Sequence, residues 1–212
     1  MSAASVKQRA ARFIRERLTL KALPFRPDIT LYSPTPQSGL NGWLTSEGLE
    51  RTPPYWAYAW GGGAALALYL RDHPEAVLGK RVLDFGAGSG LVGIAAAKAG
   101  AASVLAVEPD PVGQVALRLN AEANNVSLAL WTEPALPPVD IILAGDIFYL
   151  PEVVGRTLPI LLDAAAQGAN VLVGDPFRRD LPLDRLDLLI EYAVADMGGS
   201  APVRAGVFAL RP

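Results

Sequence analysis

The chain has 212 residues, of which 51% are hydrophobic and 19% charged, so its composition predicts a folded domain with a sizeable core. A net charge of −2 gives no overall attraction to nucleic acid or anionic membranes, and no apolar run reaches the 18 residues of a membrane span. The sequence has no cysteine and one histidine, His73, which argues against disulfides, cysteine–zinc sites, catalytic triads and multi-histidine metal sites. We therefore expect no metal and place His73 in a surface loop.

The N-terminal 54 residues read as an extension packed on the domain that follows, residues 55–212. Near the start, apolar residues recur at helical spacing among basic ones, which predicts an amphipathic helix with a solvated basic face. The alternative for this arginine-rich stretch is an organelle presequence. Residues 21–54 are rich in proline and glycine, and residues 29–32 predict a small hairpin or an edge strand.

Residues 53–63 combine an aromatic cluster with a run of glycines. Tyr55, Trp56, Tyr58 and Trp60 lie within six positions and lead into three consecutive glycines. Aromatic clusters usually belong to the core. The rings can also form the wall of a ligand site, with the glycines allowing a close approach of the backbone. Both interpretations stay open, and they are compatible with each other.

From residue 80 onward, apolar runs alternate with helical patterns. The helical segments begin near prolines and end near glycines. The expected strands are residues 81–85, 103–107, 127–131, 139–145 and 169–174, and the expected helices are residues 90–99, 111–123 and 152–167. This alternation is typical of an α/β, Rossmann-like fold, with a mostly parallel sheet and helices on both faces.

The C-terminal part departs from this alternation. Residues 183–189 have a helical pattern. Residues 192–194 and 207–210 then read as two strands, joined by a turn at residues 198–200. A hairpin at the end of a parallel sheet adds an antiparallel last strand to it.

The most informative stretch is residues 81–90, where a strand, an acid and a glycine-rich turn follow one another. The apolar run ends on Asp84, and glycines stand at positions 86, 88 and 90, before an alanine-rich helix. The missing Cβ atoms let a ligand approach the backbone and the helix N-terminus. The next strand ends on Glu108, and an acid at this place suits a pair of ribose hydroxyls. The pattern predicts a site for an adenosine-bearing small molecule.

Two cofactors are compatible with this pattern. Residues 88–93 satisfy the dinucleotide fingerprint G-x-G-x-x-G, but Asp84 would repel a pyrophosphate, and the chain leaves no second region for substrate chemistry. An NAD-linked oxidoreductase is thus the less favoured alternative. Read from Asp84 as Asp-x-Gly-x-Gly-x-Gly, the stretch resembles the first motif of the seven-strand, S-adenosylmethionine-dependent methyltransferases. Their ligand carries an ammonium, which is compatible with the acid, and no phosphate.

The resemblance implies roles for several side chains. Asp84, Gly86 and Gly88 would surround the methionine part of the cofactor, and Glu108 would hold the ribose. Two tryptophans are further cofactor candidates: Trp60, and Trp131 near the adenine, with a core position for Trp131 left open. The seven-strand order with an antiparallel last strand also matches the expected hairpin.

The fourth strand leads into the sequence Gly-Asp-Ile-Phe-Tyr at residues 145–149. Its Asp-x-x-Tyr resembles the motif of the branch that methylates protein lysines. The sequences Pro-Pro-Tyr-Trp, Trp-Gly-Gly-Gly and Gly-Asp-Pro are similar to those of the enzymes that act on the β subunit of electron-transfer flavoprotein. This resemblance covers about residues 52–210 and implies Asp146 and Tyr149 as catalytic residues. The alternative for Asp146 is a cap on the helix that starts at Pro151.

The resemblance implies S-adenosylmethionine as the cofactor and a lysine of the electron-transfer flavoprotein β subunit as the acceptor. Another protein, such as a ribosomal protein, or a small-molecule amine stays open, as does a non-catalytic binding module. We expect a monomer with no nucleic-acid or membrane partner, in the cytoplasm of a bacterium, or in the mitochondrial matrix of a eukaryote. The charged loop at residues 175–180 is either a solvated face or a contact for an acidic patch on the substrate.

Overall fold

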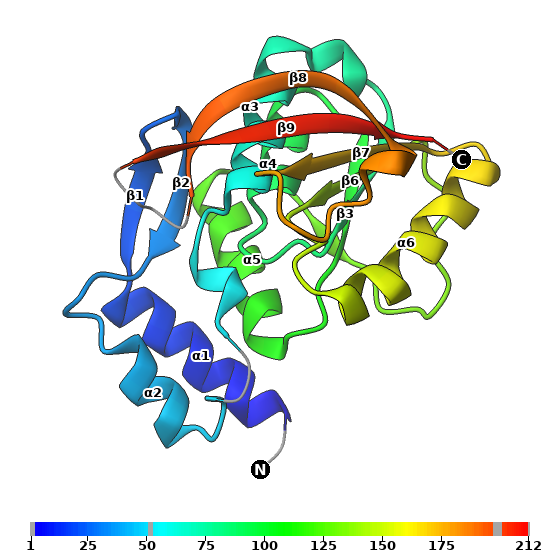
Figure 1. Cartoon of the computed structure of the whole chain (residues 1–212). Helices are drawn as coiled ribbons and strands as arrows, with labels where there is room; N and C mark the ends of the chain where they lie inside the picture. Colours follow the sequence, from blue (N-terminus) through cyan, green and yellow to red (C-terminus); the bar gives the residue numbers. More distant parts are fainter. Residues whose placement is uncertain (1–2, 51–52, 197–200, 212) are drawn as a thin grey trace.

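The structure is a computed structural model that describes residues 3–50, 53–196 and 201–211. Seven strands of this part form one sheet in the order β5-β4-β3-β6-β7-β9-β8 (Figure 1). The first five strands in this order, from β5 across to β7, are mutually parallel, and β9 runs antiparallel to both of its neighbours. The strands are β3 (Arg81–Phe85), β4 (Ser103–Val107), β5 (Ala129–Leu130), β6 (Ile141–Gly145), β7 (Asn170–Asp175), β8 (Leu186–Ala195) and β9 (Pro202–Leu210). The expected mostly parallel sheet with an antiparallel strand near its end is confirmed.

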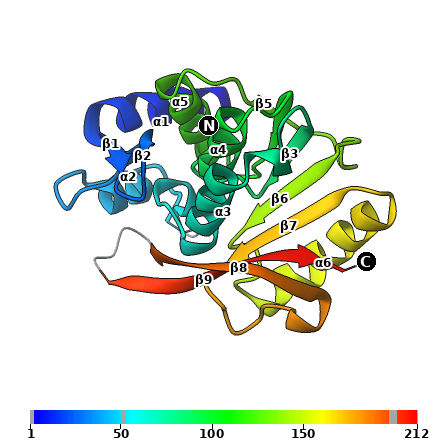
Figure 2. The same ribbon diagram turned by 90° about the horizontal axis from the view of Figure 1, so that it is seen from above.

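Helices cover both faces of the sheet. On one face, α3 (Gly61–Asp72) and α4 (Leu91–Lys98) share a buried cluster with strand residues such as Val82 and Leu143, and α5 (Pro111–Ala123) packs beside them. On the other face, α6 (Pro151–Ala166) packs on Leu83, Ile142 and their neighbours. Figure 2 shows α6 on the side of the sheet opposite to α3 and α4. Alternate residues of each parallel strand thus enter two separate cores, which explains why these strands are apolar throughout.

The helix expected at residues 183–189 is wrong. Leu183–Arg185 forms only a short 3₁₀ turn, and β8 begins at Leu186. Leucine favours a helix in isolation, but β8 pairs with β9 over nine residue pairs, from Leu186 with Leu210 to Ala195 with Pro202. Pairing with a segment distant in the sequence therefore overrides the local preference. The turn expected at residues 198–200 lies outside the described residues.

The N-terminal extension forms a small layer beside the sheet. Helix α1 (Ala3–Arg17) buries Ala10 and Ile14 against α5, so the expected amphipathic helix is confirmed and is docked on the domain. Strands β1 (Thr19–Leu23) and β2 (Arg26–Ser33) form a separate antiparallel hairpin, also as expected, and α2 (Leu40–Ser46) follows it. His73 follows the end of α3 with 41% of its side chain exposed, in agreement with a surface position. No helix within the described ranges is long and apolar enough to cross a membrane.

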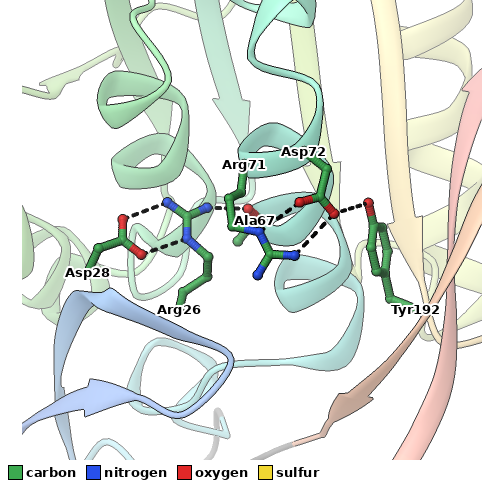
Figure 3. A network of polar contacts seen from close by, with 6 residues as sticks. All are labelled: Arg26, Asp28, Ala67, Arg71, Asp72 and Tyr192. Carbon is green, nitrogen blue, oxygen red and sulfur yellow. Dashed lines mark hydrogen bonds and ion pairs between the residues drawn. The ribbon is translucent and has the colours of Figure 1, made fainter.

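Polar contacts join the hairpin, α3 and β8 (Figure 3). The buried guanidinium of Arg26 donates to the Ala67 carbonyl in α3. It also donates to the two carboxylate oxygens of Asp28, and these two bonds are both 2.8 Å long. On the same helix, Asp72 accepts hydrogen bonds from Arg71 and, at 3.0 Å, from the hydroxyl of Tyr192 in β8. Helix α3 is therefore the element that ties the extension to the antiparallel edge of the sheet.

The first turn of α3 crosses the ends of β6 and β7 at backbone contact. A Cβ atom on Gly62 would lie 2.1 Å from the Gly174 carbonyl oxygen, and one on Gly145 would lie 3.0 Å from the backbone of Gly63. No side chain fits between the two elements, which accounts for glycine at both faces of this contact.

We expect the substitution Gly62→Ala to destabilise the protein by about 3 kcal/mol or more, because the Gly174 backbone cannot yield as a flexible side chain can. Gly155→Ala is the matched control, since its Cβ would meet nothing within 4 Å on α6 and alanine favours the helix by up to about 1 kcal/mol. Urea unfolding of the three proteins measures both effects. Equal stability of Gly62→Ala and the wild type would contradict the close contact.

Candidate active site

A cavity of about 670 Å³ opens at the carboxyl ends of β3, β4 and β6. It lies where the chain order reverses, because β4 and β5 extend the sheet on one side of β3 while β6 and β7 extend it on the other. Ligands of parallel α/β sheets bind at such switch points. Seven of the predicted site residues line this cavity: Trp60, Asp84, Gly86, Gly88, Glu108, Asp146 and Tyr149. The topology thus brings together side chains that are up to 89 positions apart in the sequence (60 to 149).

Trp131 is the predicted site residue that does not line the cavity. Its backbone N–H donates to the Ala106 carbonyl at 2.8 Å, and its indole N–H donates to the Ala135 carbonyl at 2.8 Å in the following loop. The side chain is half-buried, so it is not a core indole either. Its contact with the adenine stays a prediction.

The turn after β3 consists of glycines in left-handed backbone conformation. Gly86, Gly88 and Gly90 have φ angles of 77°, 53° and 82°, which other residues rarely adopt. The Glu108 carboxylate fixes this turn, because Oε2 accepts from the Gly88 N–H at 2.7 Å and Oε1 accepts from the Asp110 N–H at 2.8 Å. Each oxygen keeps a further lone pair for a hydroxyl of a ligand. Burial raises the pKa of Glu108 in spite of these two donors.

Asp84 lies at the floor of the cavity and is 1% exposed. Its Oδ2 accepts a hydrogen bond of 2.8 Å from the Gly93 N–H in α4. Burial raises the pKa of Asp84 to about 7, and the nearby charge of Glu108 adds to this effect. A buried carboxylate of this kind gains most from a cationic ligand group such as an ammonium, which would favour its charged form.

The aromatic segment serves both the core and the cavity. Trp56 is 2% exposed and joins the cluster between α1 and α5. Tyr55 lies with its ring centroid 5.1 Å from that of Tyr149 and 5.6 Å from that of Trp60, and all three rings line the cavity. The core interpretation therefore holds for Trp56, which also borders the cavity, and the other rings lie where the ligand-wall interpretation requires them.

Asp146 does not cap α6, because the position before that helix is Leu150 and no side-chain cap bond forms there. That alternative is wrong. The Asp146 carboxylate binds the start of α3 instead, where Oδ2 accepts from the Gly63 N–H at 2.9 Å. The residue has a φ of 56°, and its own N–H donates to Gly174 at 2.9 Å. Asp146 is thus held rigidly at the cavity wall with 8% of its side chain exposed.

Arg178 is the site residue that sequence reasoning missed. Its Nη2 lies 2.6 Å from Asp146 Oδ1, and it also lines the cavity. From the sequence, the arginines after Asp175 were interpreted as a solvated face or a contact for a partner. The contact of Arg178 with Asp146 joins two loops, and no periodic pattern in the sequence indicates it. The one available signal was their place after a parallel strand, on the same edge of the sheet as Asp146.

The switch-point cavity, the acid and glycines after β3, and the second acid after β4 define the class of seven-strand, S-adenosylmethionine-dependent methyltransferases. The cavity volume suits a nucleoside-sized ligand. The site also supplies an acid for an ammonium, Asp84, and another for ribose hydroxyls, Glu108. The residues present therefore fit the cofactor that this class uses.

Comparisons with known proteins identify the family. The sequence model of the ribosomal protein L11 methyltransferases matches residues 66–170. The electron transfer flavoprotein beta subunit lysine methyltransferase of Xenopus laevis is 36% identical over 195 residues, covering 87% of this chain and 78% of that protein. The Rattus norvegicus protein of the same name is 38% identical over 159 residues, covering 72% of this chain and 62% of that protein. The chain belongs to the family of the electron transfer flavoprotein beta subunit lysine methyltransferases, and its methyl donor is S-adenosylmethionine.

Solved structures support the fold alone. The Pyrococcus horikoshii protein PH1948, proposed to be an RNA methyltransferase, has a TM-score of 0.54 and covers 76% of this chain and 92% of its own, at 18% identity. At this identity the likeness shows a common architecture and carries no argument about the acceptor.

The raised pKa of Asp84 predicts a pH-dependent affinity for the cofactor product, S-adenosylhomocysteine. Between pH 6 and pH 7.5 the ionised fraction of a carboxyl with a pKa of about 7 rises roughly eightfold, and affinity for the ligand ammonium should rise with it. Calorimetric titration at the two pH values measures this change. The variant Asp84→Asn should lose most of the pH dependence, whereas the exposed control Asp163→Asn should keep it. A wild-type affinity that is the same at both values would contradict this role of Asp84.

Proposed function

We propose that the chain transfers methyl groups from S-adenosylmethionine to lysine side chains of the electron transfer flavoprotein β subunit. The similar proteins from Xenopus laevis and Rattus norvegicus carry this activity in their names. The observation that carries the proposal is the position of Asp146, a nearly buried carboxylate in the wall of the cavity that also contains the cofactor-binding acids. The aromatic rings of Tyr55, Trp60 and Tyr149 line the same cavity, and a carboxylate together with aromatic rings suits an amine.

The difficult step is to present a lysine as a neutral nucleophile. At pH 7 about one lysine in 2,500 is uncharged, which corresponds to a cost of roughly 4–5 kcal/mol. When bound, S-adenosylmethionine supplies an electrophilic methyl group on a positively charged sulfur. Asp146 has lone pairs left to accept a hydrogen bond from the amine, which fixes the direction of the nitrogen lone pair. Orientation of this kind lowers the barrier of a displacement by several kcal/mol.

Tyr149, Tyr55 and Trp60 supply the second part of the acceptor site. The Tyr55 ring centroid lies 5.1 Å from that of Tyr149 and 5.6 Å from that of Trp60, and all three rings form part of the cavity wall. An aromatic wall excludes water from the reacting nitrogen and interacts favourably with a methylated ammonium. The proposal therefore assigns Tyr149 to the wall of the acceptor channel, beside Asp146.

The test of the acceptor is methyl transfer to purified protein. We expect label from S-adenosylmethionine on the electron transfer flavoprotein β subunit and, by mass spectrometry of its peptides, on lysine. Ribosomal protein L11 is the comparison acceptor, because the matching sequence model carries its name. Faster transfer to L11, or label on a residue other than lysine, would contradict the proposal.

Asp146→Asn should reduce methyl transfer roughly 100-fold or more while S-adenosylhomocysteine still binds within a few-fold of the wild type. The amide keeps the size of the side chain and one oxygen for the Gly63 N–H, but the oxygen that faces Arg178 becomes an NH₂ group, which cannot accept a hydrogen bond from the amine. Radiolabel incorporation and calorimetry measure the two properties separately. Asp184→Asn, on a side chain that is 82% exposed, is the control and should leave both unchanged. Full activity of Asp146→Asn would remove Asp146 from the reaction.

A further inference from the structure

Arg178 sits at the centre of a group of acids beside the cavity. Its Nη2 lies 2.6 Å from Asp146 Oδ1 and 3.8 Å from Asp196 Oδ2, and its guanidinium carbon lies 5.7 Å from the ring centroid of Trp60. The loop that carries it is held by Asp175, whose Oδ1 accepts from the Arg178 N–H at 2.6 Å. The guanidinium is therefore positioned from both the backbone and the side-chain end.

The charges around Arg178 come close to balance. Asp196 and Asp146 accept hydrogen bonds of 2.9 Å from Gly61 and Gly63, so both carboxylates lie at the positive end of α3. Burial raises the pKa of Asp175 to about 7, so this carboxyl is partly neutral at physiological pH. One guanidinium and one helix N-terminus thus lie against the carboxyl groups of Asp146 and Asp196. The other charged or titratable groups on the cavity wall are Tyr55, Tyr58, Asp84, Glu108, Asp110, Tyr149 and Arg156.

A carboxylate without a counter-charge would hinder the methyl transfer that we propose. It would attract the lysine ammonium and hold its proton, because a negative charge within a few ångströms stabilises the charged form of an amine. The reaction needs the neutral amine. The acid that orients the nitrogen must therefore present lone pairs without presenting a full negative charge.

We propose that Arg178 is a positioning residue for the acceptor lysine, which keeps Asp146 in a charge-balanced pair so that Asp146 accepts a hydrogen bond from the amine without retaining its proton. The inference rests on the proposed lysine methylation. The geometry allows it, because a carboxylate offers about four acceptor sites and Asp146 uses one for Gly63 and one for Arg178. The proton of the lysine leaves to solvent, and the Arg178–Asp146 pair stays in place.

The pH dependence of kcat tests the inference, since kcat reports ionisations in the enzyme–substrate complex. The electron transfer flavoprotein β subunit is the acceptor in this test. The pH at which kcat reaches half of its maximum should be about one unit higher for Arg178→Gln than for the wild type. At pH 7.5 this corresponds to a loss of about tenfold, recovered largely by pH 9.5. KM should not increase, because the unpaired carboxylate attracts the ammonium more strongly. Arg178→Lys should restore most of the wild-type profile.

Arg179→Gln is the matched control, because it removes the neighbouring, exposed guanidinium and should leave the pH dependence of kcat unchanged. A loss of kcat in Arg178→Gln by the same factor at every pH would show a merely structural role and overturn the inference. So would an unshifted profile.

A second measurement separates this inference from the proposed function. Carbon-13 NMR titration of the Asp146 carboxyl, in the protein without acceptor, should show a higher pKa in Arg178→Gln than in the wild type, because the guanidinium lowers it. An equal Asp146 pKa in the two proteins would overturn the inference whatever the acceptor is. If the wild type fails to methylate lysine while the Asp146 pKa shifts as expected, the proposed function fails and the charge pairing stands.

Discussion

The close crossing of α3 over the ends of β6 and β7 is the constraint on which the site depends. Gly62 lies against the Gly174 carbonyl with no room for a Cβ atom, and this places the first N–H groups of the helix at the sheet edge. There Gly63 donates to Asp146 and Gly61 donates to Asp196. The glycine run after the aromatic residues is therefore structural in origin, and its functional effect follows from bringing a helix N-terminus up to two carboxylates.

The parallel part of the fold could be predicted from the sequence because its signals are local. Apolar runs such as Val82 and Leu83 are buried on both faces, and left-handed glycines such as Gly86 mark the turn that follows. The segment from Leu183 to Leu189 gave a wrong prediction, since its conformation depends on pairing with β9, more than twenty residues away at Leu210. The secondary-structure preference of the residues themselves cannot predict pairing with a segment so distant in the sequence.

The candidate site was predictable for residues at or just after the carboxyl ends of strands. Asp84, Glu108 and Asp146 all stand at carboxyl ends of parallel strands, which meet at one edge, so sequence position alone places them around one cavity. Arg178 stands three residues beyond β7, and its direction depends on the turn at Asp175 and on a left-handed Phe177. Trp131 was placed near the adenine by the family resemblance. It directly follows the short strand β5, its indole N–H donates to Ala135, and its role stays a prediction.

The buried carboxyl groups of Asp84 and Asp146 are neutralised in two different ways. At the expected cofactor end, burial raises the pKa of Asp84 to about 7, so an ammonium of a bound ligand would replace the proton that neutralises this carboxyl. At the acceptor end an exchangeable proton would be harmful, because it would turn one acceptor oxygen of Asp146 into a donor and leave fewer lone pairs for the amine. Burial raises the pKa of Asp146 as well, and the Arg178 guanidinium opposes that rise. A fixed counter-charge keeps the oxygens available, whereas a mobile proton would occupy one of them.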